Sequence, residues 1–261
     1  MIPGLWLYAI GRAGHPVPEG VEAIDGSSNL EMIVEGPLSA FVTPVDLRGY
    51  SQVAVDAHAG DLAWLGAIGY RHQAVMQALM NGGTVIPLRA FSLFGGRSMV
   101  EAQLRSARDQ FLAVLDRLEG KQEWTLRIEF EAQRWNEALT SRVASLRSIV
   151  EEMNAAAPGK AFLLKKKLDD ERKRASRDAE TQVVAEIEDE VMRHLACDTV
   201  AESRQQRDGA FPQINVLLNR DEEFRLQELH RELSDRYSGE GITLAVTGPW
   251  PPYTFASTTN G

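Results

Sequence analysis

Short apolar runs and stretches with helical spacing follow one another along the first 120 residues. Leu5–Ile10 is a compact apolar run that predicts a strand. Leu30–Val34 and Leu38–Thr43 are two further apolar runs separated by a Glu-Gly-Pro turn, which predicts a hairpin. Thr84–Leu88 predicts a short strand, and its Pro87 sets that strand at a sheet edge or strand end, because proline has no N–H to donate.

Helical spacing of apolar residues covers Val55–Met80. Gly66 and Gly69 are expected to break this stretch into two helices, and Asn81-Gly82-Gly83 is expected to end the second one. Ser98 is expected to cap a last helix, whose apolar stripe runs from Val100 to Leu118.

The second half of the chain has a different order of elements. Strict alternation predicts a half-buried strand over Trp124–Phe130, and a helix should follow from about Trp135 to Met153. Lys160–Ser203 contains neither proline nor glycine and predicts a long amphipathic helix, or two in series. The remaining elements expected are strand Gln213–Leu218, helix Asp221–Tyr237 and strand Ile242–Val246. This order predicts an α+β fold whose C-terminal domain is ferredoxin-like with an extended helical insertion.

A change in composition near Gly120 divides the chain. The first 120 residues contain no lysine and carry a net charge of −4, whereas the rest carries −5. We therefore expect two domains: residues 1–120 as an N-terminal α+β domain and residues 121–247 as the ferredoxin-like domain. Residues 248–261 are expected to form a C-terminal tail rich in proline and aromatic residues.

Overall charge and composition narrow the classes of function. The chain has 37 acidic and 28 basic residues, so that its formal charge is −9, and we expect neither nucleic acid nor a lipid membrane as a partner. Cys197 is the only cysteine and cannot form an internal disulfide. No targeting signal or membrane-spanning run is apparent, which predicts a cytoplasmic location.

The best candidate for an enzymatic site is a group of two carboxylates and two imidazoles: Asp56, His58, Asp61 and His72. If these side chains converged they could bind a divalent metal or act as an acid–base pair, which would make the chain a cytosolic enzyme. Their spacings match no helical ligand pair, so polar residues on solvated helix faces explain them better. Glycine-rich phosphate loops and cysteine pairs are also missing. We therefore predict no catalytic residue, cofactor or metal.

Opposite charges lie in adjacent blocks of the long predicted helix. Lys165–Arg177 has a net charge of +4, and Asp178–Glu190 has a net charge of −6. A solvated helix explains this pattern most simply. A protein-contact arm, including one that pairs with a second copy of the chain, is the main alternative, and nucleic-acid binding is disfavoured because no aromatic residue interleaves the basic run.

The C-terminal Thr-Gly-Pro-Trp-Pro-Pro-Tyr-Thr-Phe string, Thr247–Phe255, directly follows the last predicted strand. Its prolines hold the backbone extended, so that the aromatic side chains project with little loss of entropy. They could form a stiff plug in a groove between domains or an exposed patch for a partner protein. The plug is favoured, because so many large apolar groups left in water promote aggregation.

This C-terminal string closely resembles the ending of the gas vesicle protein family GvpL/GvpF. Four other segments, in the same order, resemble that family: the opening strand Leu5–Ile10, the segment His72–Phe94, the basic start of the long helix, Lys160–Lys167, and the strand Asn215–Leu218 with Glu223 and Phe224 after it. The likeness extends over essentially the whole chain. It implies a two-domain α+β accessory protein of gas vesicles, without enzymatic activity or cofactor.

The resemblance also implies partners and a location. The chain would act in gas vesicle assembly or nucleation, bind the hydrophobic main wall protein and other accessory proteins, and remain cytoplasmic and shell-associated as a minor component. Self-association is possible. The segments that carry the resemblance supply the candidate interdomain or partner contacts, which are Trp250, Pro251, Pro252, Tyr253, Phe255, Pro87, Arg89 and Phe91.

Overall fold

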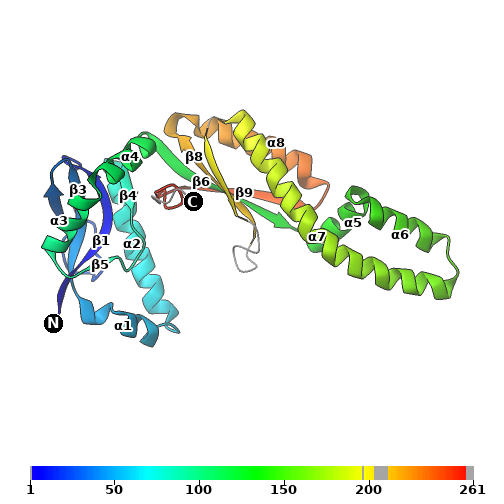
Figure 1. Ribbon diagram of the computed structural model, residues 1–261, viewed down its shortest axis with the longest axis horizontal. Coiled ribbons are helices and arrows are strands. Elements are labelled where there is room, and N and C mark those ends of the chain that lie inside the picture. The colour runs from blue at the N-terminus through cyan, green and yellow to red at the C-terminus, as the bar shows by residue number, and fades with distance from the viewer. Residues whose placement is uncertain (1, 196, 203–210, 257–261) are drawn as a thin grey trace. The chain divides into compact units, whose positions relative to one another are not determined.

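A computed structural model describes residues 2–195, 197–202 and 211–256 of the chain, which folds into helices and sheets. The described residues form two compact units. The first unit contains residues 2–123 together with residues 250–256, and the second contains the described residues from Trp124 to Pro249. Figure 1 shows the elements of each unit.

The sheet of the first unit is built around β1 (Pro3–Arg12). On one side β1 pairs antiparallel with β3 (Leu38–Asp46), which in turn pairs with β2 (Glu31–Glu35). On its other side β1 pairs with β4 (Val85–Pro87) and with β5 (Leu93–Phe94). The predicted hairpin is therefore confirmed, and so is the position of the proline-containing strand at the end of the sheet order.

β1 is paired along both edges, and it is also covered on both faces. The consecutive residues Trp6 to Ile10 are each no more than 1% exposed. An unbroken apolar run is the pattern that such a strand requires, since neither face meets water. Trp6 and Tyr8 join the core that also contains Phe41 of β3 and Met76.

The helical part of the first unit differs from the sequence prediction. Gly66 and Gly69 do not break a helix, because α2 (Leu62–Gly82) runs through both. The interruption lies earlier, between α1 (Gln52–Ala57) and Asp61, whose side chain accepts the Trp64 N–H and caps α2. Each glycine costs a helix about 1 kcal/mol, which burial of the opposite face of α2 offsets.

The last helix of this unit is likewise interrupted. It consists of α3 (Arg97–Ser106) and α4 (Arg108–Leu118), which meet at Ala107. The N-cap of α3 is Gly96 and no side chain caps that end, so the prediction that Ser98 caps it is wrong. Between β3 and α1 lies the short 3₁₀ helix η1 (Leu47–Gly49).

The second unit contains a sheet with the strand order β7-β8-β6-β9. The first strand along the chain is β6 (Lys121–Phe130), as the alternating pattern predicts. The others are β7 (Asp198–Glu202), β8 (Gln213–Asn219) and β9 (Ile242–Trp250), and β7 pairs antiparallel with β8. Two corrections follow: β7 replaces the end of the predicted long helix, and β9 extends beyond Val246.

Helices α5 (Ala132–Arg142) and α6 (Ala144–Asn154) replace the single predicted helix, which is interrupted at Val143 in an extended conformation. Both lie along the first half of α7 (Pro158–His194), and the second half of α7 covers the sheet together with α8 (Glu223–Ser238) (Figure 1). The short 3₁₀ helix η2 (Arg220–Glu222) precedes α8. One apolar core joins these helices to the sheet.

Candidate functional site

The residues Trp250–Ala256, which we call the C-terminal segment, pack within the first unit. Pro251 and Pro252 are buried, and Phe255 is only 2% exposed. The backbone N–H groups of Phe255 and Ala256 both donate to the Pro252 carbonyl oxygen, at 3.2 and 2.9 Å. The segment is thus a single tight turn that places one aromatic ring in the core.

A buried carboxylate holds this turn. Glu123 of β6 is 5% exposed and accepts two hydrogen bonds from Thr254, one from its backbone N–H at 3.0 Å and one from its hydroxyl at 2.7 Å. A carboxylate taken out of water is tolerated only when such donors replace its hydration. The contact therefore fixes the position of Thr254 and, next to it, the ring of Phe255.

A second polar contact involves His72 of α2, which is 5% exposed. The Trp6 indole N–H donates to His72 Nδ1 at 3.2 Å, so the imidazole proton lies on Nε2. That N–H donates to the Leu88 carbonyl oxygen at 3.1 Å, and the Tyr253 hydroxyl oxygen lies 3.1 Å from the same nitrogen. Burial lowers the pKa of His72 and raises the pKa of Tyr253 to about 12, so both groups are neutral at pH 7.

Aromatic rings surround this imidazole. Tyr8 stacks on His72 with ring centroids 5.5 Å apart, and Trp6 lies 5.9 Å from it. Phe91, which has a positive φ of 67°, packs on Trp6 at 5.1 Å. A neutral imidazole with two satisfied nitrogens, in such a setting, acts as a structural link between β1, Leu88 just after β4, and the C-terminal segment.

The predicted contact residues therefore occupy different environments. Pro87 is buried in β4 opposite Ala9, whereas Arg89 is exposed and its carbonyl oxygen accepts the Ser92 hydroxyl at 2.7 Å. Within the C-terminal segment, Trp250 is 41% exposed and Tyr253 is half-buried. The two prolines and Phe255 are buried within the first unit, and Trp250 keeps an accessible surface; whether the segment also fills a groove between domains stays a prediction.

The four residues of the alternative enzymatic site each make contacts of their own. Asp61 caps α2, and His58 stacks on Trp64 while its Nδ1 lies 2.8 Å from the Ala54 carbonyl oxygen. Asp56 is exposed and accepts a hydrogen bond from Gln52, and His72 belongs to the aromatic cluster. Within residues 2–195, 197–202 and 211–256, no group of three or more His, Cys, Asp or Glu side chains could hold a metal ion.

Comparison with known proteins decides the family. The sequence profile described as "Gas vesicle synthesis protein GvpL/GvpF" matches residues 4–257. This chain belongs to the GvpL/GvpF family. It is 28% identical over 258 residues to gas vesicle protein L of Streptomyces sp. (strain CB03234). The aligned region covers 96% of this chain and 92% of that protein.

Two other gas vesicle proteins are similar to this chain, one in sequence over a shorter region and one in fold. Gas vesicle protein L2 of Halobacterium salinarum (strain ATCC 700922 / JCM 11081 / NRC-1) is 29% identical over 195 residues, covering 71% of this chain and 69% of that protein. The crystal structure of GvpF from Microcystis aeruginosa superimposes with a TM-score of 0.64 at 18% identity, over 98% of this chain and all of that chain. At this identity the likeness concerns the fold. Among the described helices of this family member, none is long and apolar enough to cross a bilayer.

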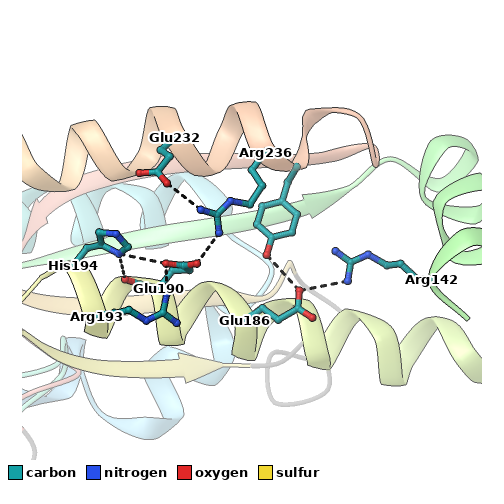
Figure 2. A network of polar contacts seen from close by, with 8 residues as sticks. Arg142, Glu186, Glu190, Arg193, His194, Glu232 and Arg236 are labelled. Carbon is teal, nitrogen blue, oxygen red and sulfur yellow. Dashed lines mark hydrogen bonds and ion pairs between the residues drawn. The ribbon is translucent and has the colours of Figure 1, made fainter.

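A further polar network, in the second unit, joins α7 to α5 and α8 (Figure 2). Glu190 accepts hydrogen bonds from Arg193 at 2.6 Å and from Arg236 at 2.7 Å, and the Arg236 guanidinium holds the pKa of Glu190 below its usual value. Glu186 accepts from the Arg142 guanidinium at 3.4 Å. Glu186 and Glu190 of the acidic half of α7 are therefore paired inside this unit.

Sequence reasoning missed two residues of the C-terminal site. Glu123 lies just before the alternating run Trp124–Phe130, and it is buried like its neighbour Trp124, so the alternation gives no sign of its burial. Trp6 appeared only as an apolar strand residue, although its N–H orients His72. A buried indole requires an acceptor, and this rule is the one signal that points from Trp6 to a polar partner.

Proposed function

We propose that this chain is an accessory protein that acts in gas vesicle assembly or nucleation by binding the hydrophobic main wall protein and other gas vesicle accessory proteins. The match of the family profile to nearly the whole chain carries the proposal. In this role the chain catalyses no reaction. It works in the cytoplasm and remains associated with the growing shell as a minor component.

We also infer that the second unit is a ferredoxin-like domain enlarged by a helical insertion. The order β6, three helices, β7, β8, α8 and β9 supports this reading, together with the strand order β7-β8-β6-β9. The inserted helices are α5, α6 and the first half of α7. They lengthen the unit without adding strands to its sheet.

The first half of α2 supplies a surface suited to an apolar wall subunit. Leu62–Tyr70 contains no charged residue, and Leu62 and Tyr70 are 81% and 77% exposed. Gly66 and Gly69 are also exposed, with open space where a Cβ would lie, so another backbone can approach closely. A helix that is apolar on its solvent side is covered in its working state. We call the exposed residues of Leu62–Tyr70 the apolar face.

Coexpression with the main wall protein tests this proposal. We expect the tagged chain to recover wall protein in the soluble fraction, in a defined ratio. The double variant Leu62→Glu/Tyr70→Glu should lose most of that recovery, because two carboxylates in an apolar contact each leave an unpaired charge without water. A matched control, Val34→Glu/Met99→Glu, changes two exposed apolar residues of the same unit and should retain it.

Two results would contradict the proposal. If no wall protein accompanied the wild-type chain, direct binding would be wrong and the chain would act through other accessory proteins. If the double variant and its control lost wall protein equally, the contact would not lie on the apolar face. Asp56→Asn/His58→Gln should leave vesicle formation unchanged, and its loss in a folded protein would favour an enzyme.

A further inference from the structure

The beginning of α7 presents apolar and basic side chains together. Phe162 and Leu163 are 73% and 67% exposed, although both are large and apolar. Lys166 and Lys167 follow one turn later and are exposed as well. This combination occurs on a helix whose opposite side is anchored, because Leu164 is buried in the core of the second unit.

The helical repeat places these residues on one side. At 100° per residue, the direction opposite to the buried Leu164 and Leu168 is shared by Phe162, Lys166 and Lys173. Next to them, a shallow hollow is lined by Leu163, Lys166, Lys167, Asp170, Glu171 and Arg174. We call Phe162, Leu163, Lys166, Lys167, Lys173 and Arg174 the basic face.

The charges of this face are poorly neutralised within the chain. In the part of the chain that the structure describes, Lys166 and Lys173 form no ion pair, and Arg174 has only Glu171 at 3.9 Å. The acidic half of the same helix differs, because its Glu186 and Glu190 accept from arginines of α5 and α8 (Figure 2). The charges of Lys166 and Lys173 are therefore left to attract an external anion.

We propose that the basic face binds an acidic segment of another protein, one that carries apolar side chains beside its carboxylates. Phe162 and Leu163 would take the apolar side chains, while the lysines would take the carboxylates. The size of the charged patch favours a narrow partner. Outside Lys165–Arg177 the chain has a net charge of −13. A wide anionic surface such as a membrane would be repelled by any of these acidic residues that come within a Debye length of it, about 8 Å, whereas a narrow segment contacts the basic face alone.

The inference does not rest on the proposed contact with the wall protein, because the basic face lies on another unit than the apolar face. It is tested with a defined probe. The probe is a fluorescent synthetic peptide of about 16 residues, with glutamates and leucines spaced to line one side of a helix. Its control replaces every glutamate by glutamine. Binding to the full-length chain is followed by fluorescence anisotropy at low and at physiological ionic strength.

We expect the glutamate peptide to bind more tightly than the glutamine peptide, with an affinity that falls as salt is added. The variant Lys166→Glu/Lys167→Glu/Lys173→Glu should bind at least about tenfold more weakly, because like charges then face each other. The matched variant, with arginine at the same three positions, should bind within about threefold of wild type. Phe162→Ala/Leu163→Ala should weaken binding about fivefold or more.

Any of three outcomes would overturn the proposal. The first is equal binding of the two peptides, or equal binding by the glutamate and arginine variants. The second is tighter binding to phosphatidylglycerol vesicles than to the peptide, which would assign the face to an anionic membrane. The third is dimerisation in analytical ultracentrifugation that the glutamate variant abolishes, which would make a second copy of the chain the partner.

Discussion

Phe255 anchors the C-terminal segment, and its replacement by alanine tests whether that anchor holds the turn. The ring is 2% exposed, and the Arg117 guanidinium lies 5.7 Å from its centroid. Removing a buried phenyl group costs about 3–5 kcal/mol, and the exposed cation–π contact adds about 0.5 kcal/mol. Because the segment is a single turn that can partly collapse into the cavity, we expect a loss near the lower end, about 3 kcal/mol.

Native-state hydrogen exchange measures this loss at the site itself. The Thr254 N–H donates to Glu123 and the Ala256 N–H to Pro252, so both are protected only while the turn is docked. A loss of about 3 kcal/mol makes these two amides exchange more than about 100-fold faster. A global unfolding curve is less suitable, because a chain with two compact units need not unfold in one transition.

The control is Trp250→Ala, which removes a larger aromatic side chain that is 41% exposed. It should change the free energy of the opening that exposes the same two amides by less than about 1 kcal/mol. The reasoning is refuted if Phe255→Ala leaves both rates unchanged, since the buried ring would then contribute nothing to docking. If the rates rise while the amides of β1 keep their protection, the segment undocks without unfolding the sheet.

Three further predictions concern other parts of the two units. Burial lowers the pKa of His72 in the folded state, so the first unit should lose stability as the pH falls below about 6.5, by up to about 1.4 kcal/mol per pH unit. Urea unfolding at several pH values measures this dependence, and His72→Gln should flatten it. Gly66→Ala and Gly69→Ala should each raise the unfolding free energy by about 0.5–1 kcal/mol, because both sites are helical and open; a lower thermal midpoint would contradict this. Arg142→Met should destabilise the second unit by about 1–3 kcal/mol, because the carboxylates of Glu186 and Glu240 lose their shared donor. The control Arg108→Met, at an exposed ion pair, should change the free energy of urea unfolding by less than about 0.5 kcal/mol.

Most strands of the first unit could be read from the sequence because their burial leaves a clear pattern. β1 is an apolar run, since both of its faces are buried, and Pro87 marks β4 as the end of the sheet order. The ends and interruptions of helices were harder to predict. Gly66 and Gly69 weaken a helix locally, but the buried side of α2, including Val75 and Leu79, stabilises it over its whole length.

The polar contacts of the candidate site lay beyond sequence reasoning for a different reason. Glu123 and Thr254 are separated by 131 positions, and His72 and Tyr253 by 181. Hydrogen bonds of this kind depend on the final packing of distant elements, and no periodicity records them. The aromatic and proline residues of Trp250–Phe255 predicted a plug between domains, but only the folded chain identifies the carboxylate and the imidazole that contact this segment.

The two charged halves of α7 show how burial changes the meaning of a charge pattern. In the sequence they form adjacent basic and acidic blocks, a pattern that is compatible with one long solvated arm. In the folded chain the acidic half lies beside α8, where Arg236 neutralises Glu190, while Lys166 of the basic half keeps its charge exposed to water. Charges that are paired inside a unit stabilise it and are hidden from partners. The basic half, where the described Lys166 and Lys173 form no ion pair and Phe162 is exposed, is therefore the part of α7 from which electrostatic recognition of another protein should proceed.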